Sequence, residues 1–66
     1  MGRYYYELLD EGYNSYEAAI PGGNYKTRAI AQAKRAMEDL GAKRARLAVY
    51  SVRTSSVLDI IPVELD

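Results

Sequence analysis

The nucleophilic side chains that this sequence offers are mainly serine hydroxyls, at Ser15, Ser51, Ser55 and Ser56. A hydroxyl needs a neighbouring base before it can attack a substrate, and the usual base is a histidine. The chain contains no histidine and no cysteine, and none of its serines stands at a recognisable spacing from a lysine. We therefore expect no catalytic residue and no enzyme activity.

Carboxylates occur as adjacent pairs at Asp10/Glu11 and Glu38/Asp39. Both pairs fall in segments typical of a turn or a helix end, where charged side chains are usually solvated. Asp10, Glu11 and Asn14 could hold a calcium ion weakly, but their spacing is not that of an EF-hand. Zinc is disfavoured because thiolate and imidazole ligands are both missing. The sequence thus predicts neither a metal site nor a cofactor.

Anion binding has better support, at the start of a predicted helix. Gly22 and Gly23 precede this helix, and Lys26 and Arg28 lie in its first turns. Free backbone N–H groups and the helix dipole favour negative charge at this end. The segment lacks the pattern of a phosphate loop, so an ordinary connection between a strand and a helix is the alternative.

Basic and aromatic residues gather on one predicted strand and its end, at Arg44, Arg46, Tyr50 and Arg53. Aromatic rings on a sheet can stack on bases while nearby cations contact phosphates, so single-stranded nucleic acid is one partner to consider. Against it stand a net charge of zero, a pI of about 6.2, and the acids Glu7 and Asp59, expected on the same face. Nucleic-acid binding is therefore the alternative function.

Four segments have the residue types and alternation of strands: residues 4–9, 14–20, 45–52 and 57–65. Gly12 gives a turn signal between the first two segments. Pro62 lies in the last segment and cannot donate a hydrogen bond to a neighbouring strand. This proline places the last strand at an edge or a bulge of the sheet.

Residues 25–40 have the period of an amphipathic helix. The apolar stripe of this helix contains Ile30, Ala33, Met37 and Leu40. Asn24 or Thr27 could cap its first turn, and Gly41 stands where a left-handed residue commonly ends a helix.

Together these elements predict one α+β domain over residues 1–66, with the order ββαββ and one helix on one face of a four-stranded, mainly antiparallel sheet. With strands numbered along the chain, the spatial order 2-1-3-4 makes every neighbouring pair antiparallel. It also puts the strand that contains Pro62 at an edge.

A single helix can cover one face of such a sheet. We expect the covered face to carry Tyr4, Tyr6, Leu8, Leu47, Val49, Leu58 and Ile60. The open face is predicted to form a partner interface made of Tyr5, Leu9, Arg46, Ala48, Tyr50, Val52 and Ile61. Tyrosine and arginine are enriched in protein interfaces, and exposed apolar patches usually mark them.

Self-association into a homodimer through this face is the leading functional hypothesis, with another protein partner also open. A chain of 66 residues buries a small core, and without cysteine it has no disulfide to stabilise it. A second subunit would add the missing apolar contact. The alternative is a monomer whose own loops or C-terminal segment cover the open face, or whose tyrosines are tolerated in water.

The sequence has no apolar run of about 18 or more residues, as a membrane span would need. Its tyrosine-rich start is soon followed by acids, which is unlike the apolar core of a signal peptide. We therefore expect no membrane association and a cytoplasmic location.

Overall fold

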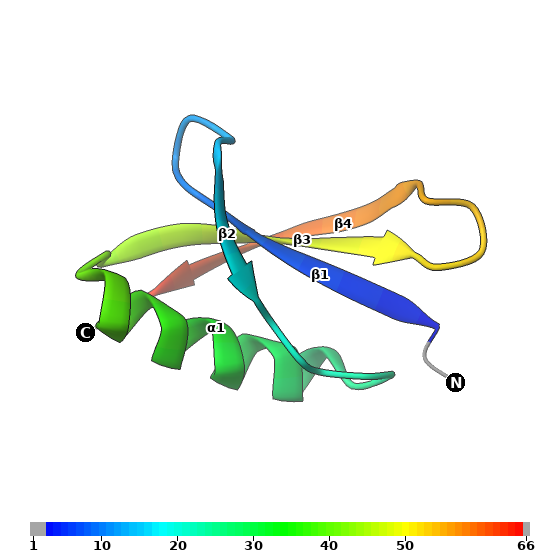
Figure 1. Ribbon diagram of the computed structural model, residues 1–66, viewed down its shortest axis with the longest axis horizontal. Helices are drawn as coiled ribbons and strands as arrows, with labels where there is room; N and C mark the ends of the chain where they lie inside the picture. The colour runs from blue at the N-terminus through cyan, green and yellow to red at the C-terminus, as the bar shows by residue number, and fades with distance from the viewer. Residues whose placement is uncertain (1–2, 66) are drawn as a thin grey trace.

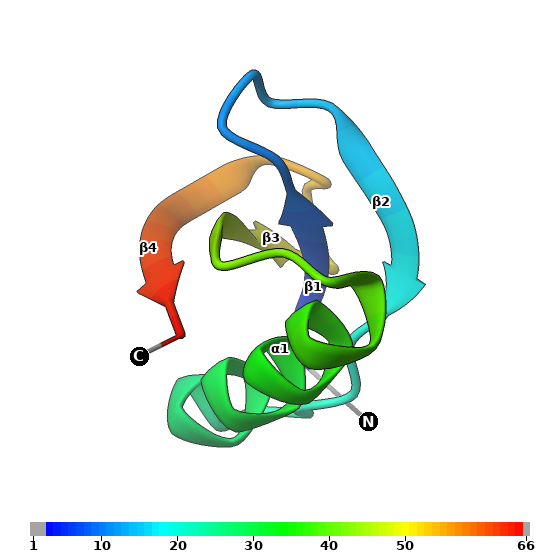
Figure 2. The same cartoon turned by 90° about the vertical axis from the view of Figure 1, so that its left-hand side faces the viewer.

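Four strands and one helix follow one another in the predicted order in a computed structural model, which describes residues 3–65. The elements are β1 (Tyr4–Leu9), β2 (Ser15–Ala19), α1 (Lys26–Leu40), β3 (Arg44–Ser51) and β4 (Val57–Glu64). The strands form one sheet in the order β2-β1-β3-β4, with every neighbouring pair antiparallel. Helix α1 lies against one face of this sheet (Figures 1 and 2). The predicted α+β class and strand order are confirmed.

Helix α1 forms where alanine is frequent and apolar residues recur once per turn. It buries Ala29, Ala33 and Met37 against the sheet, and it ends at Gly41, whose φ of 72° is left-handed as predicted. The predicted side-chain cap is absent. Tyr25 precedes the first turn without a capping hydrogen bond, and Asn24 Oδ1 instead accepts the backbone N–H of Arg3 at 2.6 Å. Within residues 3–65 no helix is long and apolar enough to span a membrane.

The core lies between α1 and the two central strands. Its largest fully buried side chains are Leu8, Met37, Leu47 and Val49. Strand residues two apart point to the same face, so Tyr6 and Leu8 of β1 join Leu47 and Val49 of β3 under the helix. Leu40, expected in the apolar stripe, is instead exposed at the last position of the helix.

The facing of β4 differs from the prediction. Leu58 and Ile60, expected in the core, are exposed, while Ile61 and Val63 pack against the core. The reason is the register, because Ile61 is paired with the buried Leu47, and residues paired across antiparallel strands share a face. A shift of one residue in register reverses the facing of a whole strand.

Gly22 joins the end of the first hairpin to the helix by close contact. A Cβ atom at this position would lie 2.6 Å from the Cβ of Ala29 and 2.9 Å from a ring carbon of Tyr6. Glycine therefore lets the connection pass between β1 and the first turns of α1, and it sets how closely the helix packs on the sheet.

We predict that Gly22→Ala lowers the free energy of unfolding by about 1–3 kcal/mol, because the added methyl must displace backbone or a packed ring. Urea denaturation measures the change. Gly23→Asn is the matched control. Gly23 has a φ of 57°, and a Cβ atom added there would meet no other atom within 4 Å. Asparagine tolerates this conformation. Equal losses in the two variants would contradict the packing role assigned to Gly22.

Candidate functional site

The face of the sheet opposite α1 consists of side chains that alternate with those of the core. Cross-strand pairing arranges them in three rows: Tyr5–Tyr50–Val57, Glu7–Ala48–Ile60 and Leu9–Arg46–Pro62. In Figure 2 no helix or strand lies over this side of the sheet, although the turn between β1 and β2 rises beside it. We call this surface the open face.

One end of the open face is closed by the protein's own side chains. The guanidinium of Arg46 lies 4.5 Å from the centre of the Tyr13 ring, and its Nη1 donates to the Tyr13 hydroxyl at 3.3 Å. Leu9 and Ala48, the predicted apolar interface residues nearest to Arg46, are only 7% and 1% exposed. This end therefore offers little apolar surface to a partner.

The turn that carries Tyr13 is organised by Asp10. Its Oδ1 accepts the backbone N–H groups of Gly12 and Asn14, both at 2.8 Å. These bonds, first of all that from the Asn14 N–H, lower the pKa of the Asp10 carboxyl because they favour its charged form. Asp10 and Asn14, considered above as calcium ligands, thus shape a turn. No group of three metal-ligating side chains occurs in the described part of the chain.

The middle of the open face holds a polar pair beside a stack of aromatic rings. Tyr5 and Tyr50 stack with their ring centres 4.8 Å apart and their planes 7° from parallel. The Tyr50 hydroxyl donates to Glu7 Oε1 at 2.8 Å. This hydrogen bond to a carboxylate raises the pKa of Tyr50. The carboxylate of Glu7 consequently has a partner within the chain.

The other end of the open face is apolar and exposed. Four large side chains on it are between 39% and 52% exposed: Tyr5, Val52, Val57 and Ile60. Tyr5 lies on β1, Val57 and Ile60 lie on β4, and Val52 lies in the turn just after β3, where its N–H donates to the carbonyl of Arg3 at 3.0 Å. We call these four residues the apolar patch. Leu58, also exposed, adjoins it on β4.

The predicted interface residues therefore separate into distinct groups. Tyr5 and Val52 lie in the apolar patch, and Tyr50 lies beside it. Leu9 and Arg46 lie at the closed end, and the buried Ala48 lies in the middle row between Glu7 and Ile60. Ile61 was predicted on the open face but packs against the core, because its register partner Leu47 faces the helix.

Sequence reasoning missed Val57 and Ile60. Strand β4 has apolar residues at both odd and even positions, so alternation gave no signal for which of them face the helix. The pairing with β3 decides the facing, and this pairing contains a register shift opposite Val49 and Tyr50.

The four residues of the predicted anion site each have a contact within the chain. The ammonium of Lys26 lies 5.8 Å from the centre of the Tyr4 ring, and the guanidinium of Arg28 lies 5.3 Å from that of Tyr25. Gly22 is packed against Ala29, and the Gly23 carbonyl accepts the Tyr6 hydroxyl at 2.9 Å. Lys26 and Arg28 thus each lie near a different tyrosine ring.

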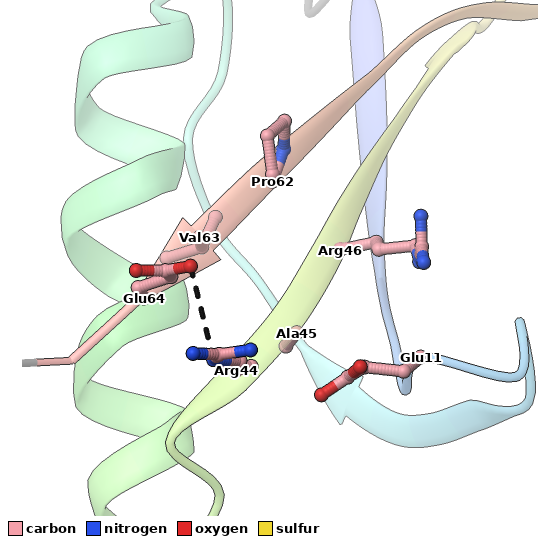
Figure 3. A pocket seen from close by; sticks show the side chains of 7 residues that line it. All are labelled: Glu11, Arg44, Ala45, Arg46, Pro62, Val63 and Glu64. Carbon is pink, nitrogen blue, oxygen red and sulfur yellow. Dashed lines mark ion pairs between the residues drawn. The ribbon is translucent and has the colours of Figure 1, made fainter.

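A shallow hollow of about 160 Å³ lies where β3 begins and β4 ends. Its charged lining comprises Glu11, Arg44, Arg46 and Glu64. Figure 3 shows Arg46 on one side and, on the other, the ion pair of Arg44 Nε with Glu64 Oε1, 3.8 Å apart. The hollow is smaller than the usual range for ligand pockets, about 300–1,000 Å³. Its charges of both signs favour no particular ion.

Comparison with protein-family models, with curated proteins and with solved structures finds no match to this chain.

We predict that Tyr50→Phe lowers the free energy of unfolding by about 0.5–1.5 kcal/mol at neutral pH, because the half-buried Glu7 carboxylate loses its hydrogen bond while the ring stack remains. Urea denaturation measures the change. Tyr5→Phe is the control, since no side-chain hydrogen bond involves Tyr5 within residues 3–65, and its effect is expected to be smaller. A larger loss in Tyr5→Phe would argue against the Glu7 contact.

The lowered pKa of Asp10 predicts that the stability of the fold depends on pH in the acid range. Its pKa in the folded chain lies below the ordinary value of 3.8. Its contribution is therefore complete above that value and disappears as the pH falls through the lowered one. We expect the wild-type chain to be more stable than Asp10→Asn at about pH 6 and to lose this advantage near about pH 2. An unchanged difference in urea midpoints would show that the carboxylate charge has no part in the turn.

Proposed function

We propose that this protein is a small binding module that self-associates, two copies meeting through the apolar patch on the open face. The observation that carries the proposal is the joint exposure of Tyr5 on β1, Val57 and Ile60 on β4, and Val52 in the turn after β3. Fully burying an exposed aliphatic side chain contributes about 1.5–3 kcal/mol, and the residues of the apolar patch, already about half buried, would each gain a part of this. The core of a domain of this length contributes little stabilisation free energy. Contact with a second copy would therefore add a large share of the total stability.

The polar groups around the apolar patch suit the edge of an interface. Glu7 accepts a hydrogen bond from Tyr50, and Arg46 donates one to Tyr13, so each of these charged groups already has a contact within its own chain. Interfaces of this kind have an apolar centre and a polar rim. A two-fold contact would place the apolar patch of one copy against that of the other.

Single-stranded nucleic acid, the alternative, has less support. The exposed ring of Tyr5 could stack on a base. Two of the three arginines that should contact phosphate have contacts within the chain, Arg46 with Tyr13 and Arg44 with Glu64, while Arg53 is exposed. The carboxylate of Glu7 also lies next to the stacked rings and would repel phosphate.

Size-exclusion chromatography with light scattering tests the proposal. At high micromolar concentration we expect a mass of at least twice the 7.4 kDa of one chain. Tyr5→Lys should weaken association at least about tenfold, because a charge would be buried at the centre of the contact. Leu40→Lys is the matched control, a similarly exposed residue on the helix, and should leave association unchanged. A wild-type monomer, or equal effects of the two variants, would refute the proposal.

Binding to fluorescent single-stranded oligonucleotides at low salt separates the two functions. Tight binding that weakens steeply with added salt and with Arg46→Ala would favour nucleic acid. We expect no such binding.

A further inference from the structure

Three segments that are far apart in the sequence meet at the end of the molecule where β1 begins. The backbone N–H of Arg3 donates to Asn24 Oδ1 in the loop before α1, and the Arg3 carbonyl accepts the N–H of Val52 in the turn after β3. In Figure 1 these segments lie on the same side of the molecule. The fold therefore holds the start of β1, the start of α1 and the turn between β3 and β4 close together.

Each of these segments carries exposed cations, namely Arg3, Lys26, Arg28 and Arg53. We call these four residues the basic end. None of them forms an ion pair within residues 3–65, where the only ion pair joins Arg44 and Glu64. The first acid after the turn, Asp59, lies inside β4, and its Oδ1 accepts the backbone N–H of Ile60. The basic end therefore carries an excess of positive charge.

The charges on helix α1 oppose its dipole. Lys26 and Arg28 lie near its start, where the first turn contains no acid, and Glu38 and Asp39 lie near its end, where the last turn contains no base. The start of a helix has a partial positive charge, so cations there lower its stability and acids would raise it. Departures from such local preferences are expected at functional sites. Folding alone therefore does not explain the cations at this position.

We propose that the basic end binds an acidic segment of another protein, one in which several aspartates or glutamates lie close together in sequence. Guanidinium and ammonium groups donate hydrogen bonds to carboxylates, and the charges make these bonds stronger than neutral ones. Four cations on three segments can contact carboxylates spread along one extended chain. The basic end shares no residue with the apolar patch, so this contact does not depend on the proposed self-association.

The aromatic rings at the basic end favour an acidic peptide over single-stranded nucleic acid. Nucleic acid is usually bound by cations together with rings that stack on bases. The two rings here already have a cation near them, Lys26 at Tyr4 and Arg28 at Tyr25. Carboxylates need no free ring, and a net charge of zero for the whole chain disfavours a long polyanion such as nucleic acid.

Fluorescence anisotropy with a labelled oligoglutamate peptide tests this inference. We expect binding at low salt that weakens steeply by about 0.5 M salt, because exposed charges are then screened within a few ångströms. Unlabelled single-stranded oligonucleotides of the same length serve as competitors and should not displace the peptide more readily than unlabelled oligoglutamate does. Absence of peptide binding at low salt, or displacement by much lower concentrations of oligonucleotide, would overturn the inference.

A matched pair of variants separates a local contact from a general effect of charge. Lys26→Glu reverses a charge in the basic end, and Lys43→Glu makes the same change at an exposed lysine beyond the other end of α1. We expect Lys26→Glu to weaken peptide binding at least about tenfold and Lys43→Glu to change it far less. Equal effects of the two variants would show that only the net charge matters, and would overturn the inference.

Stability and mass measurements on the variants exclude two other causes. Lys26→Glu places an acid in the first turn of α1, so its urea midpoint should rise even as peptide binding falls. Its mass by light scattering should match that of the wild-type chain, because Lys26 lies outside the apolar patch. Tyr5→Lys, which tests self-association, should still bind the peptide. Loss of peptide binding in Tyr5→Lys would contradict a separate site at the basic end.

Discussion

The structure depends on the contact of one amphipathic helix with a four-stranded sheet that has two faces. Helix α1 fills the space over β1 and β3 with Ala29, Ala33 and Met37, and the core is complete on that side. Small residues on the helix allow a close approach, and Gly22 allows the connection from the first hairpin to follow it. No second helix exists in residues 3–65 to cover the opposite face. The apolar side chains of that face must therefore be covered by other groups or stay exposed to solvent.

The two ends of the open face differ in how far their side chains are covered. At one end the chain covers itself, because the turn held by Asp10 presents Tyr13 to Arg46, and Leu9 is buried there. At the other end no segment of the described chain performs this role, and the apolar patch stays exposed. The contrast between the ends matters more for function than the overall composition of the face. It concentrates the apolar surface on a small area beside the edge strand β4.

The arrangement also explains why charge does not define the site. Of the basic residues of β3, Arg44 is paired with Glu64, and Arg46 stacks on Tyr13 but keeps its charge. An exposed ion pair such as the first contributes little to stability, but it reduces the positive charge at the start of β3. On the open face of the described residues, the large exposed side chains are those of the apolar patch. Another protein chain can cover a patch of this kind.

The sequence by itself determined the elements, their order and the strand topology, because periods of 2 and 3.6 residues, turn glycines and the edge proline are local signals. It also placed Tyr5, Tyr50 and Val52 on the open face. Only the tertiary structure decided the facing of β4, because apolar residues at both parities leave its register open until the strand pairs with β3. The burial of Leu9 and Ala48 likewise needed the tertiary fold, since burial depends on neighbours that folding brings together from distant parts of the chain.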